Sequence, residues 1–199
     1  DPRRTETASV ADCHHFIRPG TDALLLAALL RTILDEGLAR PGRLAAWCDG
    51  VEVLPGLLAD FEPRRVAEAT GIAAEDIVAM ARSFATAPAA VCYGRMGVST
   101  QRFGSLCQWL INLLNIVTGN LDRAGGAMFT TPAVDLVART GAGRLGSRRS
   151  RRRGLPGFGG ELPVAALAEE MLDDGPGRIR ALVTVAGNAK SLVDTTSLI

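Results

Sequence analysis

Apolar residues recur every three or four positions in several segments of the chain. This period places the apolar side chains on one side of an α-helix, which can then pack against a hydrophobic core. After the first such segment comes Gly37, which is suited to end a helix because glycine readily adopts a left-handed conformation. On this pattern we predict helices at residues 22–36, 66–70, 74–87, 105–118 and 162–172.

Three other apolar segments lack the helical period. Residues 89–94 and 179–188 end in glycine or Gly-Asn and are typical of buried parallel strands, and residues 13–18 suit a strand. Helices that alternate with such strands indicate an α/β protein with a parallel sheet. We predict one domain over residues 1–199, with an irregular loop at about residues 131–160.

The composition is that of a folded protein. Of the 199 residues, 47% are hydrophobic and 22% are charged, which excludes a disordered chain. The formal net charge of +1 argues against a dedicated nucleic-acid-binding protein. The one dense charge run, within residues 146–154, is interpreted as a solvated loop, with a partner or nucleic-acid contact through residues 148–153 as the alternative. No apolar run reaches membrane-spanning length and no signal peptide is visible, so we expect a cytoplasmic protein without a membrane span in this segment.

Cysteine and histidine provide little material for a metal or catalytic site. The four cysteines are widely spaced and form no CxxC pair, so we predict neither a zinc nor an iron–sulfur site in this segment. Cys92 and Cys107 lie in apolar runs and are predicted to be buried thiols. The only histidines, His14 and His15, are interpreted as structural or exposed residues, and no general acid or base is predicted.

Four loop segments combine turn residues with polar side chains. They are "DPRRT" at the start, "PGTD" at residues 19–22, "GRMGVSTQ" at residues 94–101 and "AGN" at residues 186–188. Glycine lets a ligand approach the backbone, arginine can pair with phosphate, and an aspartate can accept two hydrogen bonds from the N–H edge of guanine. Together the segments suit a phosphate-bearing nucleotide. Each segment alone is weak evidence for a nucleotide site. The Gly-Thr-Asp segment, for example, is also an ordinary helix start.

The order and approximate spacing of longer segments around these loops resemble a known family. The chain is similar to the interior of the molybdopterin oxidoreductases of the dimethyl sulfoxide reductase superfamily, which includes formate dehydrogenases and nitrate reductases. The resemblance covers nearly the whole chain and implies a Rossmann-like, three-layer α/β domain with a short parallel sheet. The segments that carry it are "DPRRTETA", "IRPGTDALLLAALL", "YGRMGVSTQRFG", "NLLNIVTGNLDRAGGAMF" and "RALVTVAGN".

The resemblance implies a bis(molybdopterin guanine dinucleotide) cofactor that carries molybdenum or tungsten. In similar proteins the first segment lies beside a guanosine, and the Gly-Thr-Asp segment holds the guanine, here with the carboxylate of Asp22 on its N–H edge. The glycine-rich turn lies near the pterin and pyrophosphate, and the Gly-Asn strand end contacts the second nucleotide half. The cofactor-binding residues that the resemblance implies are Asp1, Pro2, Arg3, Thr5, Gly20, Thr21, Asp22, Gly94, Arg95, Met96, Gly97, Gln101, Gly187 and Asn188.

Two segments depart from the family's pattern. Ala189 follows Asn188 where the family usually continues with proline. Residues 122–126 read "DRAGG" where members often have "GxPGG". Neither change removes a polar contact that the resemblance implies.

The resemblance also implies parts of a parent protein that lie outside this segment. We expect the metal ligand and, where present, a 4Fe–4S cluster motif in a preceding part, and another domain in a following part. An electron-transfer partner is also expected. The parent would catalyse two-electron redox chemistry on a small substrate, and the 199-residue segment alone would be inactive. The alternative is a non-catalytic relative like the large iron–sulfur subunit of respiratory complex I, against which the retained polar motifs argue.

Overall fold

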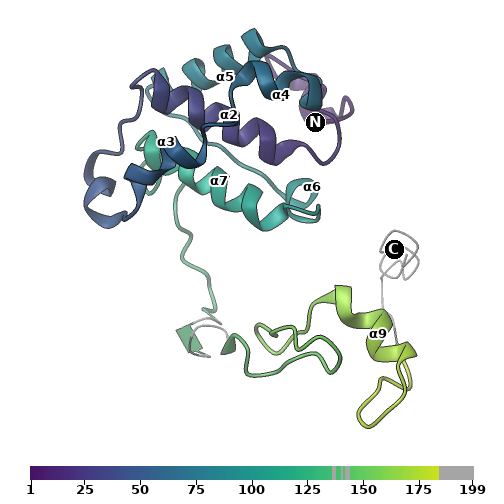
Figure 1. Ribbon diagram of the computed structural model, residues 1–199. Coiled ribbons are helices and arrows are strands. Elements are labelled where there is room, and N and C mark those ends of the chain that lie inside the picture. Colours follow the sequence, from purple (N-terminus) through teal and green to yellow (C-terminus); the bar gives the residue numbers. More distant parts are fainter. Residues whose placement is uncertain (136–137, 140, 142–143, 184–199) are drawn as a thin grey trace. The chain divides into compact units, whose positions relative to one another are not determined.

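The structure is a computed structural model that describes residues 1–135, 138–139, 141 and 144–183 (Figure 1). The chain divides into two units, Asp1–Phe129 and Thr130–Ile199. No helix in these described ranges has the length and apolar character needed to cross a membrane.

The helices predicted in the first unit from the apolar period are present, with ends that differ by a few residues. Pro63 begins one of them, because its fixed φ suits a first helical turn. The period does not predict three further helices of four or five residues. The helices of this unit are α1 (Glu6–Val10), α2 (Asp22–Asp35), α3 (Leu54–Leu57), α4 (Pro63–Thr70), α5 (Ala74–Thr86), α6 (Met96–Ser99) and α7 (Gly104–Val117), with 3₁₀ turns η1 (Gly42–Trp47) and η2 (Val51–Val53).

α2 forms the centre of the first unit. It packs against α4, α5 and α7, and its apolar side chains belong to two groups of buried residues. Leu30 and Ile33 lie in the group that includes α7, whereas Ala28 lies in the group that includes Val66 of α4 and Ile77 of α5. A helix that is apolar on more than one side is buried, and α2 accordingly lies between the α4–α5 pair and α7 (Figure 1).

The prediction of a Rossmann-like, three-layer α/β domain with a short parallel sheet is wrong. The described residues form helices, turns and isolated β-bridges, and they contain no sheet. Residues 13–18 and 89–94 form no strand. Residues 179–183 form none either, and the rest of that predicted strand, residues 184–188, lies outside the described residues.

Side chains on and just after α7, instead of a neighbouring strand, bind the backbone of residues 89–94. The buried Asn115 side chain accepts a hydrogen bond from Cys92 N at 2.9 Å and donates one to Cys92 O at 2.8 Å. Asn120 Oδ1 accepts from Ala90 N at 3.3 Å. An apolar run indicates that a segment is buried, but it does not indicate which groups take up its backbone hydrogen bonds. This is why the apolar pattern predicted a strand where none exists.

The described part of the second unit contains the short helix α9, two further helical residues, Ala138 and Arg139, and several turns. The 3₁₀ turn η4 (Val164–Ala166) leads directly into α9 (Leu167–Leu172), so the helix predicted at residues 162–172 begins as a tighter turn. The chain before it, within residues 144–163, forms turns and isolated bridges.

Candidate functional site

A cavity of about 640 Å³ lies at the start of α2 in the first unit, and we call it the Asp22 cavity. Three separate parts of the chain line it: the N-terminal residues, the turn before α2, and the turn that contains α6. The structure therefore brings together many residues that the sequence analysis selects from distant segments. These are Asp1, Pro2, Gly20, Asp22, Gly94, Arg95, Gly97 and Gln101.

Four other predicted residues are not among the cavity's lining residues. Thr5 instead caps α1, where its hydroxyl accepts a hydrogen bond from Ala8 N at 3.2 Å. Arg3 N donates to Asp1 Oδ1 at 3.2 Å, which shapes the turn before that helix. Thr21 and Met96 lie beside lining residues without lining the cavity themselves. The last two predicted residues, Gly187 and Asn188, lie outside the described residues.

The turn before α2 leaves the Asp22 side chain free of a capping role. Gly20 has a φ of +83°, a left-handed conformation that favours glycine. Thr21 occupies the cap position, but its hydroxyl donates to Arg18 O at 2.7 Å and does not cap the helix. Asp22 is the first residue of the helix, where a negative charge interacts favourably with the helix dipole. The Gly-Thr-Asp segment thus starts a helix without using its carboxylate as a cap.

A side-chain hydrogen bond joins Asp22 to the turn after α6. Gln101 Nε2 donates to Asp22 Oδ2 at 2.7 Å and to Gly97 O at 2.9 Å. One amide thereby connects two motifs that are 79 positions apart in the sequence. Because a carboxylate has about four acceptor positions, Asp22 keeps most of its capacity to bind N–H donors.

Two glycines in the turn around α6 have different tasks. A Cβ added at Gly94 would lie 2.5 Å from Ile111 Cδ1, so a side chain here would displace the end of the Ile111 side chain where this turn packs on α7. Gln108 of α7 holds the same residue by donating to Gly94 O at 3.1 Å. A Cβ added at Gly97 would meet nothing within 4 Å, which leaves open space beside the backbone. The turn is therefore anchored at one end and accessible at the other.

The cavity has one positively charged lining residue, Arg95. Its guanidinium donates to Tyr93 Oη at 3.4 Å, and this hydrogen bond raises the pKa of Arg95. The side chain therefore stays charged and can pair with an anionic group of a ligand.

The sequence analysis missed residues that line or support the cavity. Tyr93, Ile17 and Val98 line it, and their positions next to the selected motifs would have been a usable signal. Gln108 and Asn115 support the turn from α7. The signal for these two is a pair of amides seven positions, or about two helical turns, apart in a helix with an apolar face.

Thiols and histidines have structural surroundings. Cys107 is fully buried, as predicted, whereas Cys92 is only partly buried. Desolvation raises the pKa of Cys107 and raises that of Cys92 to about 11, so both thiols are protonated near neutral pH. His14 Nε2 lies 3.1 Å from Asp1 O, and His15 Nδ1 lies 3.6 Å from Asp76 Oδ2. Within the described part of the chain, no three His, Cys, Asp or Glu side chains are grouped so that they could hold a metal ion.

The arginine run at residues 148–153 is paired within the second unit. Arg153 Nε lies 2.8 Å from Glu169 Oε1, Arg151 pairs with the buried Glu170, and Arg152 pairs with an aspartate at the end of α9. These ion pairs neutralise three of the five arginines in the run, so less free positive charge remains for a polyanion.

Comparison with known proteins identifies relatives of this chain. The chain is 32% identical over 139 residues to the periplasmic nitrate reductase of Desulfovibrio desulfuricans, a match that covers 65% of this chain and 18% of the relative. It is 32% identical over 123 residues to formate dehydrogenase H of Escherichia coli, covering 62% of this chain and 17% of that enzyme. Among solved structures, acetylene hydratase from Pelobacter acetylenicus matches with a TM-score of 0.58 and 31% identity, covering 64% of this chain and 17% of that one.

These matches concern a small part of each relative. The chain spans less than a fifth of the length of the proteins it matches. No family model matches the chain. The relatives nevertheless share one superfamily, and each aligns with about two thirds of this chain at 31–32% identity. By this homology, the chain belongs to the molybdopterin oxidoreductase superfamily.

Proposed function

We propose that this chain forms part of the cofactor-binding region of a molybdenum or tungsten oxidoreductase that uses bis(molybdopterin guanine dinucleotide). The observation that carries the proposal is the Asp22 cavity, where three parts of the chain surround the Asp22 carboxylate. The homology to a nitrate reductase and a formate dehydrogenase supports a redox function. The parent protein would catalyse two-electron redox chemistry on a small substrate, and this chain would bind and orient the cofactor.

The groups around the Asp22 cavity fit the guanine nucleotide end of such a cofactor. Guanine presents two adjacent N–H donors on one edge, and the Asp22 carboxylate offers two acceptor oxygens. Arg95 supplies a positive charge for a phosphate group. The open space beside Gly97 gives a ligand access to the backbone. Acceptor, cation and accessible backbone thus occur together in one cavity.

Each of these residues has a separate task in the proposal. Asp22 accepts hydrogen bonds from the base, Gln101 orients that carboxylate by donating to Oδ2, and Arg95 neutralises phosphate charge. The bound cofactor supplies the metal centre that exchanges electrons with the substrate. The metal ligand, any 4Fe–4S cluster and the electron-transfer partner would lie in other parts of the parent assembly, so the 199-residue chain alone would be inactive.

Titration of the full-length apo-protein with the cofactor tests the role of Asp22. The substitution Asp22→Asn keeps the shape of the side chain but replaces one acceptor oxygen with a donor. Loss of one charged hydrogen bond should weaken binding by about 1.5–3 kcal/mol, which isothermal titration calorimetry can measure.

The matched control is Asp49→Asn, which makes the same chemical change at an exposed residue outside the cavity. This variant should bind the cofactor like the wild type. Equal cofactor affinities for the two variants would contradict the proposed role of Asp22.

A further inference from the structure

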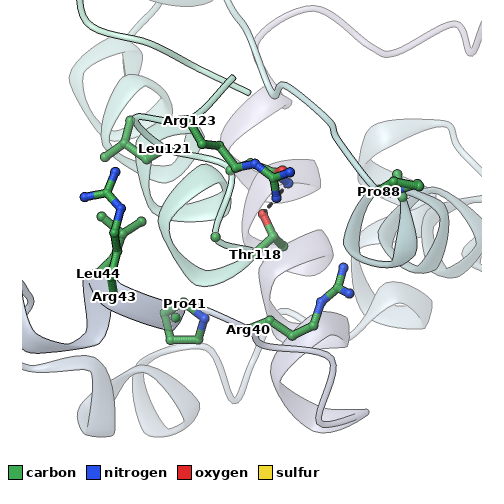
Figure 2. Close-up of a pocket in the computed structure, with 12 residues that line it drawn as sticks. Arg40, Pro41, Arg43, Leu44, Pro88, Thr118, Leu121 and Arg123 are labelled. Atoms are coloured by element: carbon green, nitrogen blue, oxygen red, sulfur yellow. Dashed lines mark hydrogen bonds between the residues drawn. The ribbon is translucent and has the colours of Figure 1, made fainter. Parts of the chain in front are cut away.

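A second cavity of about 300 Å³ lies in the first unit, near the end of α7, and we call it the arginine cavity (Figure 2). The segment after α2, the end of α5 and the loop after α7 line it. It shares no lining residue with the Asp22 cavity. Its lining residues are Arg40, Pro41, Gly42, Arg43, Leu44, Ala87, Pro88, Thr118, Gly119, Asn120, Leu121 and Arg123.

Three arginines line the arginine cavity, and no acidic residue does. Arg43 is neutralised by an ion pair to Asp122 at 2.9 Å, just outside the lining. Arg40 donates to Ala85 O, which uses one of its five N–H groups, and within the described residues neither Arg40 nor Arg123 forms an ion pair. Two guanidinium charges are thus uncompensated at one cavity.

The two uncompensated arginines approach the cavity from opposite sides. Figure 2 shows the side chains of Arg40 and Arg123 entering the space beside Thr118 and Pro88, whereas Arg43 lies on the far side near Leu121. The Thr118 hydroxyl donates to Leu114 O at 2.7 Å and accepts from the Asn120 amide at 3.0 Å, so its own hydrogen bonds are made within the protein. The arginines are therefore the donors that remain for a ligand.

Close backbone packing holds the two arginines in place. Arg40 N donates to Val117 O at 2.6 Å. Gly119, with a φ of +69°, lies so near that an added Cβ would be 2.5 Å from Arg40 O. The loop that carries Arg123 is closed by the hydrogen bond from Ala127 N to Asn120 O at 2.8 Å. These contacts fix the backbone that carries the two arginines, so less backbone entropy is lost when a ligand binds.

We propose that the arginine cavity binds a phosphate-type oxyanion through the guanidinium groups of Arg40 and Arg123. Guanidinium presents a planar fork of N–H donors that matches two oxygens of a phosphate. Pro41, Leu44 and Pro88 provide apolar lining beside the two guanidinium groups. The ligand is inorganic phosphate or the phosphate group of a nucleotide, and this proposal does not depend on the function of the Asp22 cavity.

Calorimetric titration of the full-length protein with inorganic phosphate at low ionic strength tests the proposal. The wild type should bind phosphate, and Arg123→Gln should weaken binding by about tenfold or more, as the loss of a charged hydrogen bond predicts. Arg64→Gln, which removes an exposed arginine from α4 away from this cavity, should bind like the wild type. Arg123 has no ion pair to lose within the described residues, so this variant should fold normally.

A second titration with guanosine monophosphate separates the two sources of phosphate. If the arginine cavity takes a nucleotide, guanosine monophosphate binds more tightly than phosphate, and Arg123→Gln weakens it while Asp22→Asn does not. If it takes the free anion, Arg123→Gln weakens the binding of phosphate but leaves the binding of guanosine monophosphate unchanged. The proposal is overturned if phosphate does not bind, or if Arg123→Gln and Arg64→Gln bind it equally.

Discussion

The two cavities of the first unit differ in the sign of the groups that line them. The Asp22 cavity is lined by two carboxylates, of Asp1 and Asp22, and one guanidinium group, of Arg95, whereas the arginine cavity contains three guanidinium groups and no carboxylate. One short segment takes part in both, because Pro88 lines the arginine cavity and Tyr93 and Gly94 line the Asp22 cavity. In a chain with a formal net charge of +1, opposite local charges are therefore presented at two ends of the same segment.

The two cavities also depend on different supports. Asn115 and Gln108 hold the part of the segment that leads into the Asp22 cavity. Gly119, packed against Arg40, shapes the arginine cavity. Substitutions at these supports should therefore damage one cavity more than the other.

The largest effect is expected from Asn115→Leu. The apolar side chain has a similar size but leaves Cys92 N and Cys92 O without their hydrogen-bond partners. Two unsatisfied backbone groups should lower the free energy of unfolding by about 2–5 kcal/mol, measured by urea denaturation. Asn112→Leu is the control, because Asn112 is exposed on the same helix and donates only to Gln108 O. A loss of the same size in the control would show that Asn115 has no special role.

A smaller effect is expected from Gly119→Ala. The alanine would have to adopt the left-handed backbone conformation of Gly119, and its Cβ would displace Arg40 O. We therefore expect the free energy of unfolding to fall by about 2–4 kcal/mol and phosphate binding to weaken. Gly37→Ala has a similar φ of +63° but would meet nothing within 4 Å, so it should lose only about 1–2 kcal/mol. Thermal or urea denaturation gives both values. If the two glycines tolerate alanine equally, the contact with Arg40 does not shape the cavity.

The smallest effect concerns the thiol between the two cavities. Burial raises the pKa of Cys92 to about 11, so near pH 8 it should react with iodoacetamide at least about tenfold more slowly than the exposed Cys13. Because the thiolate is the reactive form, the rate for Cys92 should rise as the pH approaches its pKa. Mass spectrometry of each cysteine peptide measures the rates. In Asn115→Leu, Cys92 should react faster, and an unchanged rate would indicate that the segment does not need the Asn115 amide.

The sequence predicts the four longer helices of the first unit, α2, α4, α5 and α7, because each of them buries apolar side chains. Leu30 and Ile33 recur at the spacing that α2 requires, and the structure buries both completely. The absence of a sheet from the described residues could not be predicted in the same way. Residues 89–94 are apolar, but the groups that bind their backbone, on Asn115 and Asn120, lie more than twenty positions further along the chain.

The candidate site was likewise predictable only in part. Motif order selects Gly20, Asp22, Gly94 and Gln101, and the structure places all of them at one cavity. The hydrogen bond between Gln101 and Asp22 could not be predicted, because its geometry depends on how the turn around α6 packs on α7. Pairings over such distances are properties of the tertiary structure, and a local pattern does not contain them.

The Asn115 amide also determines the register of the segment that joins the cavities. An amide side chain has one acceptor and one donor, so it can bind both backbone groups of a single residue, here Cys92. A shift by one residue would place Val91 or Tyr93 opposite the amide and would reverse the direction of the neighbouring side chains where the segment is extended. A residue with a side chain would then take the place of Gly94 beside Ile111, and its Cβ would displace Ile111 Cδ1. A single buried amide thus specifies which residues reach each of the two cavities.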